Sequence, residues 1–315
     1  MPASSAPPDA CGNEWIPPSA LEPSGTVTTS DGVDVCFYDL GGDGPDLVLA
    51  HATGFCAAVL SPMATALHDR FRCVALDLRA HGRSARPVDG GFDWHHFAAD
   101  VLAVVDCLDL DSPVAFGHSC GGATLLLAEQ ARPGTFASLY CYEPVVRPTN
   151  APLAPNRKDN SLARGALRRR STFISREEAL ANFKSKAPFD RFRPDVLAAY
   201  VDNGFVPGPN GEITLRCRRE DEASMYAHGF SHDAFARLPT VRCSVTLACG
   251  AETDSFGPDF LAILAGRLAG STTLALAGLG HFGPLEDPDA VARSVTASLA
   301  DRDPDEARTF RRDGQ

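Results

Sequence analysis

The chain has 315 residues and a formal net charge of −11, and 44% of its residues are hydrophobic while 22% are charged. This composition is typical of a globular protein with a sizeable core, and the acidic balance argues against nucleic acid as the main partner. The first residues lack the basic and apolar regions of a secretory signal, and no apolar run has the length of a membrane span. We therefore expect a cytoplasmic protein with no membrane partner.

Apolar runs alternate with helical patterns after the first 24 residues, which are rich in Pro, Ala and Ser and are predicted to form a flexible arm. The pair Asp31-Gly32 predicts a hairpin turn between the first two strands. Apolar runs predict strands at 26–29, 33–38, 47–50, 72–76, 113–116 and 137–142, and 3.6-residue periodicity predicts helices at 57–67, 94–108 and 123–129.

The alternation stops near residue 147 and returns near residue 240. Segments 175–184 and 194–201 have helical patterns, the first opening with a Ser-Arg-Glu-Glu capping signature. Residues 147–239 are therefore predicted to form a mostly helical insertion. Its first part, residues 147–193, holds twelve Lys or Arg against four Asp or Glu. This run allows steering of an anionic substrate, but we favour the plainer interpretation of a solvated helical surface.

Beyond the insertion, strands are predicted at 243–249 and 272–276 and helices at 258–268 and 288–299, followed by a charged tail at 301–315. Strands that alternate with helices predict an α/β fold with a mainly parallel central sheet and helices on both faces. Right-handed connections place the C-terminal ends of the parallel strands along one edge, where ligands bind in such folds. Most of the ten cysteines lie inside these apolar patterns and are predicted to be buried, reduced thiols.

The stretch from Gly117 to Gly121 reads Gly-x-Ser-x-Gly between a predicted strand and a predicted helix. This is the context of a nucleophile elbow, a sharp turn that needs small flanking residues because its central residue is strained. The pattern predicts that Ser119 presents its hydroxyl at the catalytic edge of the sheet, beside the positive end of the following helix.

A serine needs a base to act as a nucleophile, and the base needs a carboxylate to orient it. His281 follows the last predicted strand and is our candidate base. Asp254, which follows the preceding strand, is our candidate acid, with Glu252 as its nearest competitor. Glu143 lies on the same edge, but we favour its interpretation as a loop residue that contacts the insertion.

An oxyanion hole should use two backbone N–H groups. We assign the first to Cys120, directly after the nucleophile, and the second to Thr53 in the loop after strand 47–50, with Gly54 as the alternative. His51 and His81 occupy loops near the same edge and are candidates to line the site.

Taken together, these motifs resemble those of the α/β-hydrolase fold superfamily. The resemblance rests on His51 to Phe55, Asp77 to Ser84, Gly117 to Gly122, Gly250 to Asp254 and Gly280-His281. It implies a core of residues 25–146 and 240–300 with a cap at 147–239. The chain departs from the pattern in two places, having Ala52 where members usually have glycine after the histidine, and Ala80 where they usually have glycine after the arginine.

These features predict a serine hydrolase that cleaves an ester, thioester, lactone or C–C bond of a small-molecule substrate through an acyl-enzyme. An acyltransferase or a cofactor-free perhydrolase would use the same triad, and a non-catalytic ligand-binding member of the fold is the alternative outside enzymology. No metal-ligand cluster or nucleotide fingerprint is evident in the sequence, so we expect neither a metal nor a cofactor.

Overall fold

A computed structural model describes residues 20–150 and 160–299 of the chain. The predicted tail and residues 1–19 of the predicted arm lie outside the described residues. The rest of that arm is held in place, because the N–H of Leu21 donates to Oδ1 of Asn203 at 2.6 Å and the N–H of Ser24 donates to the carbonyl of Phe37.

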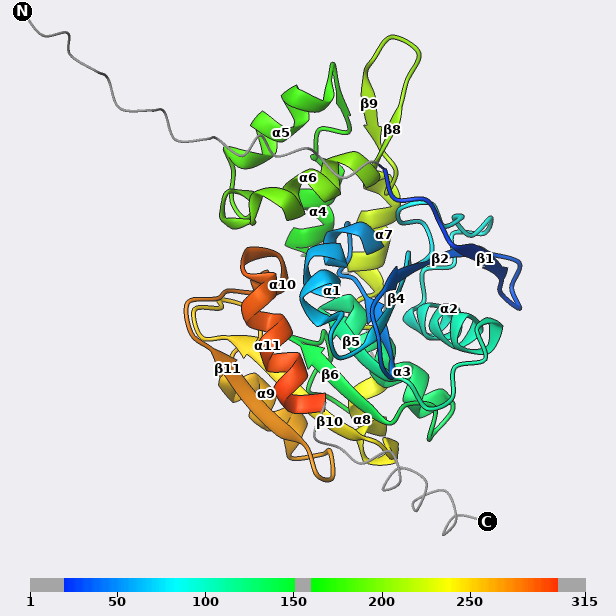
Figure 1. Ribbon diagram of the computed structural model, residues 1–315, viewed down its shortest axis with the longest axis vertical. Helices are drawn as coiled ribbons and strands as arrows, with labels where there is room; N and C mark the ends of the chain where they lie inside the picture. Colours follow the sequence, from blue (N-terminus) through cyan, green and yellow to red (C-terminus); the bar gives the residue numbers. More distant parts are fainter. Residues whose placement is uncertain (1–19, 151–159, 300–315) are drawn as a thin grey trace, which may run out of the picture.

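The core is an eight-stranded sheet with the order β1-β2-β4-β3-β5-β6-β10-β11 (Figure 1). The two N-terminal strands run antiparallel to their neighbours, and all other neighbouring pairs in this sheet are parallel. The predicted parallel sheet is therefore confirmed. The strands are β1 (Gly25–Thr28), β2 (Asp34–Gly41), β3 (Asp46–Ala50), β4 (Arg72–Leu76), β5 (Val114–His118), β6 (Ser138–Tyr142), β10 (Ser244–Gly250) and β11 (Thr272–Leu276).

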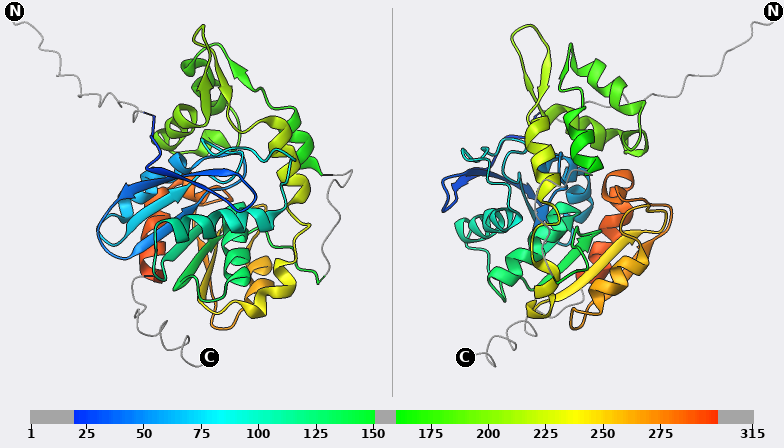
Figure 2. Two further views of the ribbon diagram at one scale, coloured as in Figure 1. Left: turned by 90° about the vertical axis from the view of Figure 1, so that its right-hand side faces the viewer. Right: turned by 180° about the vertical axis from the view of Figure 1, so that it is seen from behind.

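Helices cover both faces of this sheet (Figures 1 and 2). Successive residues of a strand point to opposite faces of the sheet. Along β4, Val74 and Leu76 pack in one hydrophobic cluster, and Cys73 and Ala75 pack in the other. The helices around the sheet are η1 (Ala57–Leu60), α1 (Ser61–Leu67), α2 (Trp94–Cys107), α3 (Cys120–Ala131), α8 (Ala234–Arg237), η3 (Leu238–Thr240), α9 (Pro258–Ala265), α10 (Gly283–Glu286) and α11 (Pro288–Leu299).

Residues 160–228 of the insertion lie beyond one edge of the core (Figure 2), and we call them the cap. Ser175 caps the predicted helix, accepting from the N–H of Glu178. The cap also contains a three-stranded sheet, β7-β9-β8, that the sequence did not predict because each strand is only two or three residues long. The cap elements are α4 (Ser161–Leu167), β7 (Thr172–Phe173), α5 (Arg176–Lys184), η2 (Phe189–Arg191), α6 (Pro194–Asn203), β8 (Phe205–Pro207), β9 (Ile213–Leu215) and α7 (Arg219–His228).

The nine cysteines among the described residues are all free thiols, and seven of them are buried, as their apolar surroundings predicted. The tenth, Cys11, lies outside the described residues. Within the described ranges, the structure has no helix with the length and hydrophobicity needed to cross a membrane.

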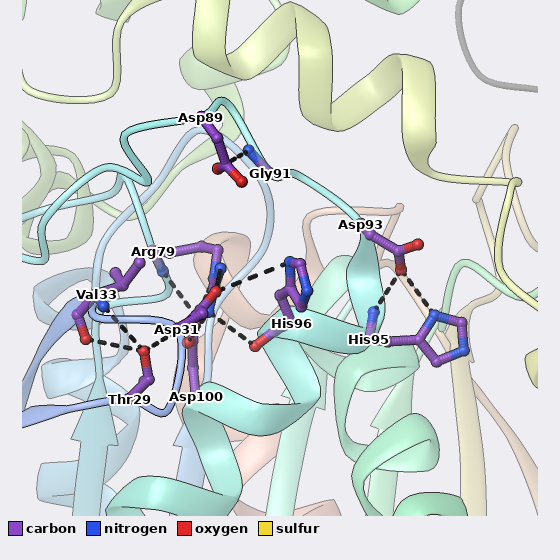
Figure 3. Close-up of polar contacts among 10 residues, drawn as sticks. All are labelled: Thr29, Asp31, Val33, Arg79, Asp89, Gly91, Asp93, His95, His96 and Asp100. Atoms are coloured by element: carbon purple, nitrogen blue, oxygen red, sulfur yellow. Dashed lines mark hydrogen bonds and ion pairs between the residues drawn. The ribbon is translucent and has the colours of Figure 1, made fainter.

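A buried arginine holds together the loop after β4, the first hairpin and helix α2 (Figure 3). The side chain of Arg79 is fully buried and donates to Asp100 through Nη2 at 2.6 Å and Nε at 2.9 Å. Its Nη1 reaches Asp31 at 2.7 Å, and this contact lowers the pKa of Asp31 to about 2. Ala80, next in the chain, has φ +60°, so alanine here occupies the left-handed region that glycine prefers.

The substitution Asp100→Asn is expected to lower the free energy of unfolding by about 3 kcal/mol, because it removes one charge of a buried pair and leaves Arg79 under-neutralised. Asp31→Asn, at the partly exposed end of the same network, should cost about 1 kcal/mol or less. Urea unfolding followed by circular dichroism compares the two variants. Equal losses of unfolding free energy would contradict the expectation that the buried Arg79–Asp100 pair contributes more to stability than the partly exposed contact with Asp31.

Helix α2 is also fixed at its first turn, next to the site described below. His95 contacts Asp93 through Nδ1 at 2.7 Å and Asp233 through Nε2 at 2.8 Å (the first contact is drawn in Figure 3). The hydrogen bond to Asp93, with the one to Asp233, raises the pKa of His95 to about 8. The adjacent Trp94 is buried and stacks on His232 with ring centroids 5.3 Å apart. This ring is thereby held at the start of α2.

Candidate active site

The predicted nucleophile elbow is present at the end of β5. Ser119 has φ +56° and ψ −111°, a strained conformation for a residue other than glycine, and helix α3 begins at the next residue. A Cβ on Gly117 would lie 2.6 Å from the backbone of Gly121, and one on Gly121 would lie 2.2 Å from the carbonyl oxygen of Ala50. The two glycines are therefore required because helix and strands approach each other closely there.

Ser119 and His281 line the same cavity, whose volume is about 600 Å³. Thr53 contributes from the loop after β3, and Trp94 lies at the start of α2. The cap covers the cavity with residues of α7, among them Tyr226. Sequence reasoning had not identified Trp94 or Tyr226 as site residues, because nothing in a single helical pattern indicates which face will cover a cavity.

The carboxylate beside His281 is Glu143, not the predicted Asp254. Nδ1 of His281 lies 2.7 Å from Oε2 of Glu143, which follows β6. Asp254 instead accepts a hydrogen bond from the hydroxyl of Ser255 at 3.1 Å, on an exposed part of the loop. Glu252 is also turned away, with its carboxylate 3.8 Å from the guanidinium of Arg191.

The geometry around Glu143 explains this correction. Its side chain is fully buried, and its backbone has φ +46°. Besides His281, it accepts from the N–H of Gly250 at 3.0 Å and from the hydroxyl of Thr253 at 2.9 Å. The end of β10 and the loop after it thus supply hydrogen-bond donors to the Glu143 carboxylate. They do not place a carboxylate of their own beside His281. The sequence signal was the Glu-Pro pair that ends strand β6 at the catalytic edge.

The histidine loop is anchored on both sides of His281. The hydroxyl of Tyr142 donates to the carbonyl of Gly280 at 2.8 Å. His118 contacts the carbonyl of His281 itself through Nε2 at 2.9 Å, and burial holds the pKa of His118 well below its usual value. His118 is therefore a neutral imidazole that donates to this carbonyl, which leaves the ring of His281 to the cavity and to Glu143.

Two buried histidines support the loop after β3 instead of lining the cavity. Nε2 of His51 accepts from the N–H of Leu78 at 3.1 Å, and Nε2 of His81 accepts from the N–H of Gly54 at 2.9 Å. Burial lowers the pKa of both rings, so both are neutral and fit these acceptor roles. The bond to His81 occupies the N–H of Gly54, which removes Gly54 as an oxyanion donor and leaves Thr53.

The thiol of Cys120 does not have the properties of a reactive cysteine. It is fully buried at the start of α3, and burial raises its pKa to about 12, so it stays protonated. Within the described residues, no hydrogen bond uses the backbone N–H of Cys120 or that of Thr53. Both N–H groups are thus available where the oxyanion hole was predicted.

Several arginines of the cap pair with acidic side chains instead of lining the cavity. No Lys or Arg is among the described residues that line it. Arginines of the predicted basic run contact acidic partners, in the pairs Arg169–Glu222, Arg170–Glu178, Arg176–Asp202, Arg191–Glu286 and Arg193–Asp195. These contacts do not favour the interpretation of this run as a binding site for an anionic substrate.

The cavity walls are mostly apolar, with aromatic rings from both core and cap. In the described part of the chain, no group of three or more His, Cys, Asp or Glu side chains is placed to hold a metal ion. The chemistry that this arrangement can perform is acyl transfer at a serine, with an imidazole and a carboxylate behind it.

A model of the alpha/beta hydrolase family matches residues 47–294. The non-heme chloroperoxidase of Streptomyces lividans is 40% identical over 116 residues, which are 36% of this chain and 42% of that protein. A bifunctional esterase/perhydrolase of Acinetobacter calcoaceticus is 42% identical over 100 residues, 31% of this chain and 36% of that protein. The chain thus matches these curated relatives over less than half of their length.

A solved structure of E-2-(acetamidomethylene)succinate hydrolase has a similar fold, with a TM-score of 0.73 and 19% sequence identity over 87% of this chain and 98% of that one. The family match spans most of the parallel sheet, the elbow and the histidine loop. The chain belongs to the alpha/beta hydrolase family.

Proposed function

We propose that this protein is a serine hydrolase that cleaves an ester or thioester of a small, uncharged, mainly apolar substrate through an acyl-enzyme. One observation carries the proposal: a serine in the strained elbow conformation shares a cavity with an imidazole whose other nitrogen lies 2.7 Å from a buried carboxylate. The apolar walls and the absence of Lys or Arg among the described lining residues favour an uncharged substrate.

In this mechanism Nε2 of His281 takes the proton of Ser119 as the hydroxyl oxygen attacks the substrate carbonyl carbon. Glu143 holds Nδ1–H, so the tautomer with a free Nε2 lone pair is the one present, and the carboxylate stabilises the imidazolium that forms. The N–H groups of Thr53 and Cys120 donate to the oxyanion, and the positive end of α3 adds to this stabilisation.

Collapse of the tetrahedral intermediate breaks the bond to the leaving group, which takes the proton from His281. Water then attacks the acyl carbon, passes a proton to Nε2, and releases the acid together with the free Ser119 hydroxyl. A nucleophile other than water that reaches the acyl-enzyme would take up the acyl group by the same steps.

The proposal is tested by incubating the protein with a fluorophosphonate probe and locating the adduct by mass spectrometry. We expect a single adduct, on the peptide that contains Ser119, because this serine shares the cavity with the imidazole that would activate it. A panel of p-nitrophenyl esters from acetate to octanoate then maps the acyl chain that the cavity takes. A folded protein without an adduct would favour the non-catalytic, ligand-binding alternative.

Perhydrolysis is the second candidate, because relatives of 40% and 42% identity carry the names chloroperoxidase and esterase/perhydrolase. Hydrogen peroxide would replace water as the acceptor and release a peracid from the same acyl-enzyme. Peracid formed from acetate esters in the presence of hydrogen peroxide distinguishes this activity from plain hydrolysis.

A further inference from the structure

Helix α7 of the cap lies against the loop that carries Thr53. A Cβ on Gly54 would lie 2.7 Å from Oε1 of Glu222, so this carboxylate touches the loop directly. Glu222 is buried and paired with Arg169 at 2.5 Å. Four residues further along the helix is Tyr226, which is on the same face because residues four apart share a face of an α-helix.

Tyr226 lines the cavity together with Ser119, Thr53 and His281. Side chains on an α-helix lean toward the N-terminus of the helix, which for this residue is the direction of Glu222 and Gly54. Tyr226 therefore belongs to the cap side of the cavity that also holds Ser119 and the loop of Thr53.

The hydroxyl of Tyr226 differs from those of the other tyrosines. The chain has five tyrosines, and four of them have hydroxyl groups in hydrogen bonds, namely Tyr38 with Asp77, Tyr140 with Ser294, Tyr142 with Gly280 and Tyr200 with Arg169. The side chain is partly buried, and no hydrogen bond between described residues involves the hydroxyl of Tyr226. A phenol at the wall of the cavity that has no protein partner can give its hydrogen bond to a ligand.

We propose that the Tyr226 hydroxyl donates a hydrogen bond to the substrate carbonyl oxygen as it becomes an oxyanion, so that the cap adds a third donor to the N–H groups of Thr53 and Cys120. This inference rests on the proposed serine hydrolase function. It makes Tyr226 a catalytic residue, because its proton contacts the atom on which negative charge develops.

The neighbouring charges are consistent with this role. A lone carboxylate beside the oxyanion would repel it, but Arg169 neutralises Glu222. Burial, followed by the nearby Glu222, raises the pKa of Tyr226, so the phenol keeps its proton throughout the working pH range. The paired ions therefore fix the helix against Gly54, and the neutral phenol supplies the hydrogen bond.

The test compares Tyr226→Phe with the unmodified protein on the panel of p-nitrophenyl esters. We expect kcat to fall about 10- to 100-fold with KM changed less than threefold, because the lost bond forms mainly in the transition state. The fall should be similar for every acyl chain, since all of them share the carbonyl oxygen. Inhibition by butylboronic acid, whose adduct with Ser119 carries a tetrahedral anion, should weaken by a similar factor.

Tyr140→Phe is the control, because it removes a buried phenol hydroxyl that bonds to Ser294 of α11 and is not among the described residues that line the cavity. It should leave kcat within twofold. Values of kcat within twofold for Tyr226→Phe, or a loss confined to KM, would overturn the inference. Failure of the underlying function would look different, as the unmodified protein would then form no fluorophosphonate adduct at all.

Discussion

Replacement of Ser119 by alanine is expected to lower kcat for a p-nitrophenyl ester by about a millionfold, to the level supported by binding and the oxyanion donors alone. His281→Ala should lose nearly as much, and the double variant should lose no more than either single variant. The reason is that the serine and the histidine act as one unit: without the base the hydroxyl is not a nucleophile, and without the hydroxyl the base has no proton to accept. Steady-state rates on a single good substrate give all three values.

Ser255→Ala is the control for this series, because Ser255 is another serine that lines the same cavity. Its hydroxyl bonds to Asp254 and is not in the elbow conformation, so its removal should change kcat less than threefold. If the double variant lost activity well beyond both single variants, Ser119 and His281 would be acting independently, and an acyl-enzyme through a serine–histidine pair would be contradicted.

The position of the strained elbow at Ser119 could be predicted from sequence because it is set by local geometry. The glycines at 117 and 121 are needed wherever a strand turns this sharply into a helix, and the structure shows the backbone contacts that a Cβ would break. The strands and helices of the core could also be predicted from sequence, because apolar runs and a 3.6-residue periodicity mark the residues that become buried. The strands observed from β1 to β6, and then β10 and β11, are the predicted ones.

The carboxylate beside His281 could not be predicted in the same way. Sequence order places Glu143, Glu252 and Asp254 at the same edge of the sheet, but it does not say which side chain a loop turns inward. In the structure the loop after β10 turns the N–H of Gly250 and the hydroxyl of Thr253 toward the interior, which leaves Asp254 outside. That choice depends on contacts between segments more than 100 residues apart, which no local pattern encodes.

The cap was predicted only in outline for a related reason. Its strands are too short to show a two-residue alternation, and some of its arginines find partners at long sequence separations. Arg169 pairs with Glu222, which is 53 residues away. A count of charges along residues 147–193 does not show these pairs, because the acidic partners of Arg169, Arg176 and Arg191 lie outside that run.

Glu143→Gln is expected to lower kcat by about 10⁴-fold, whereas Asp254→Asn should leave it within threefold. The amide is nearly the same size as the carboxylate, but it cannot stabilise an imidazolium, and it allows His281 to adopt the tautomer with its proton on Nε2. In that tautomer the nitrogen facing Ser119 has no lone pair to accept the hydroxyl proton. Steady-state kinetics on the same ester measure both variants.

Loss of folding must be separated from loss of catalysis for Glu143→Gln, because the side chain is fully buried and accepts hydrogen bonds from His281, Gly250 and Thr253. Breaking such a network costs about 1–3 kcal/mol of unfolding free energy, which lowers the folded fraction by far less than 10⁴-fold in a protein of ordinary stability. Urea unfolding of each variant supplies this correction. If kcat fell by about 10⁴-fold in Asp254→Asn instead, the loop after β10 would have to rearrange when substrate binds and bring Asp254 to His281.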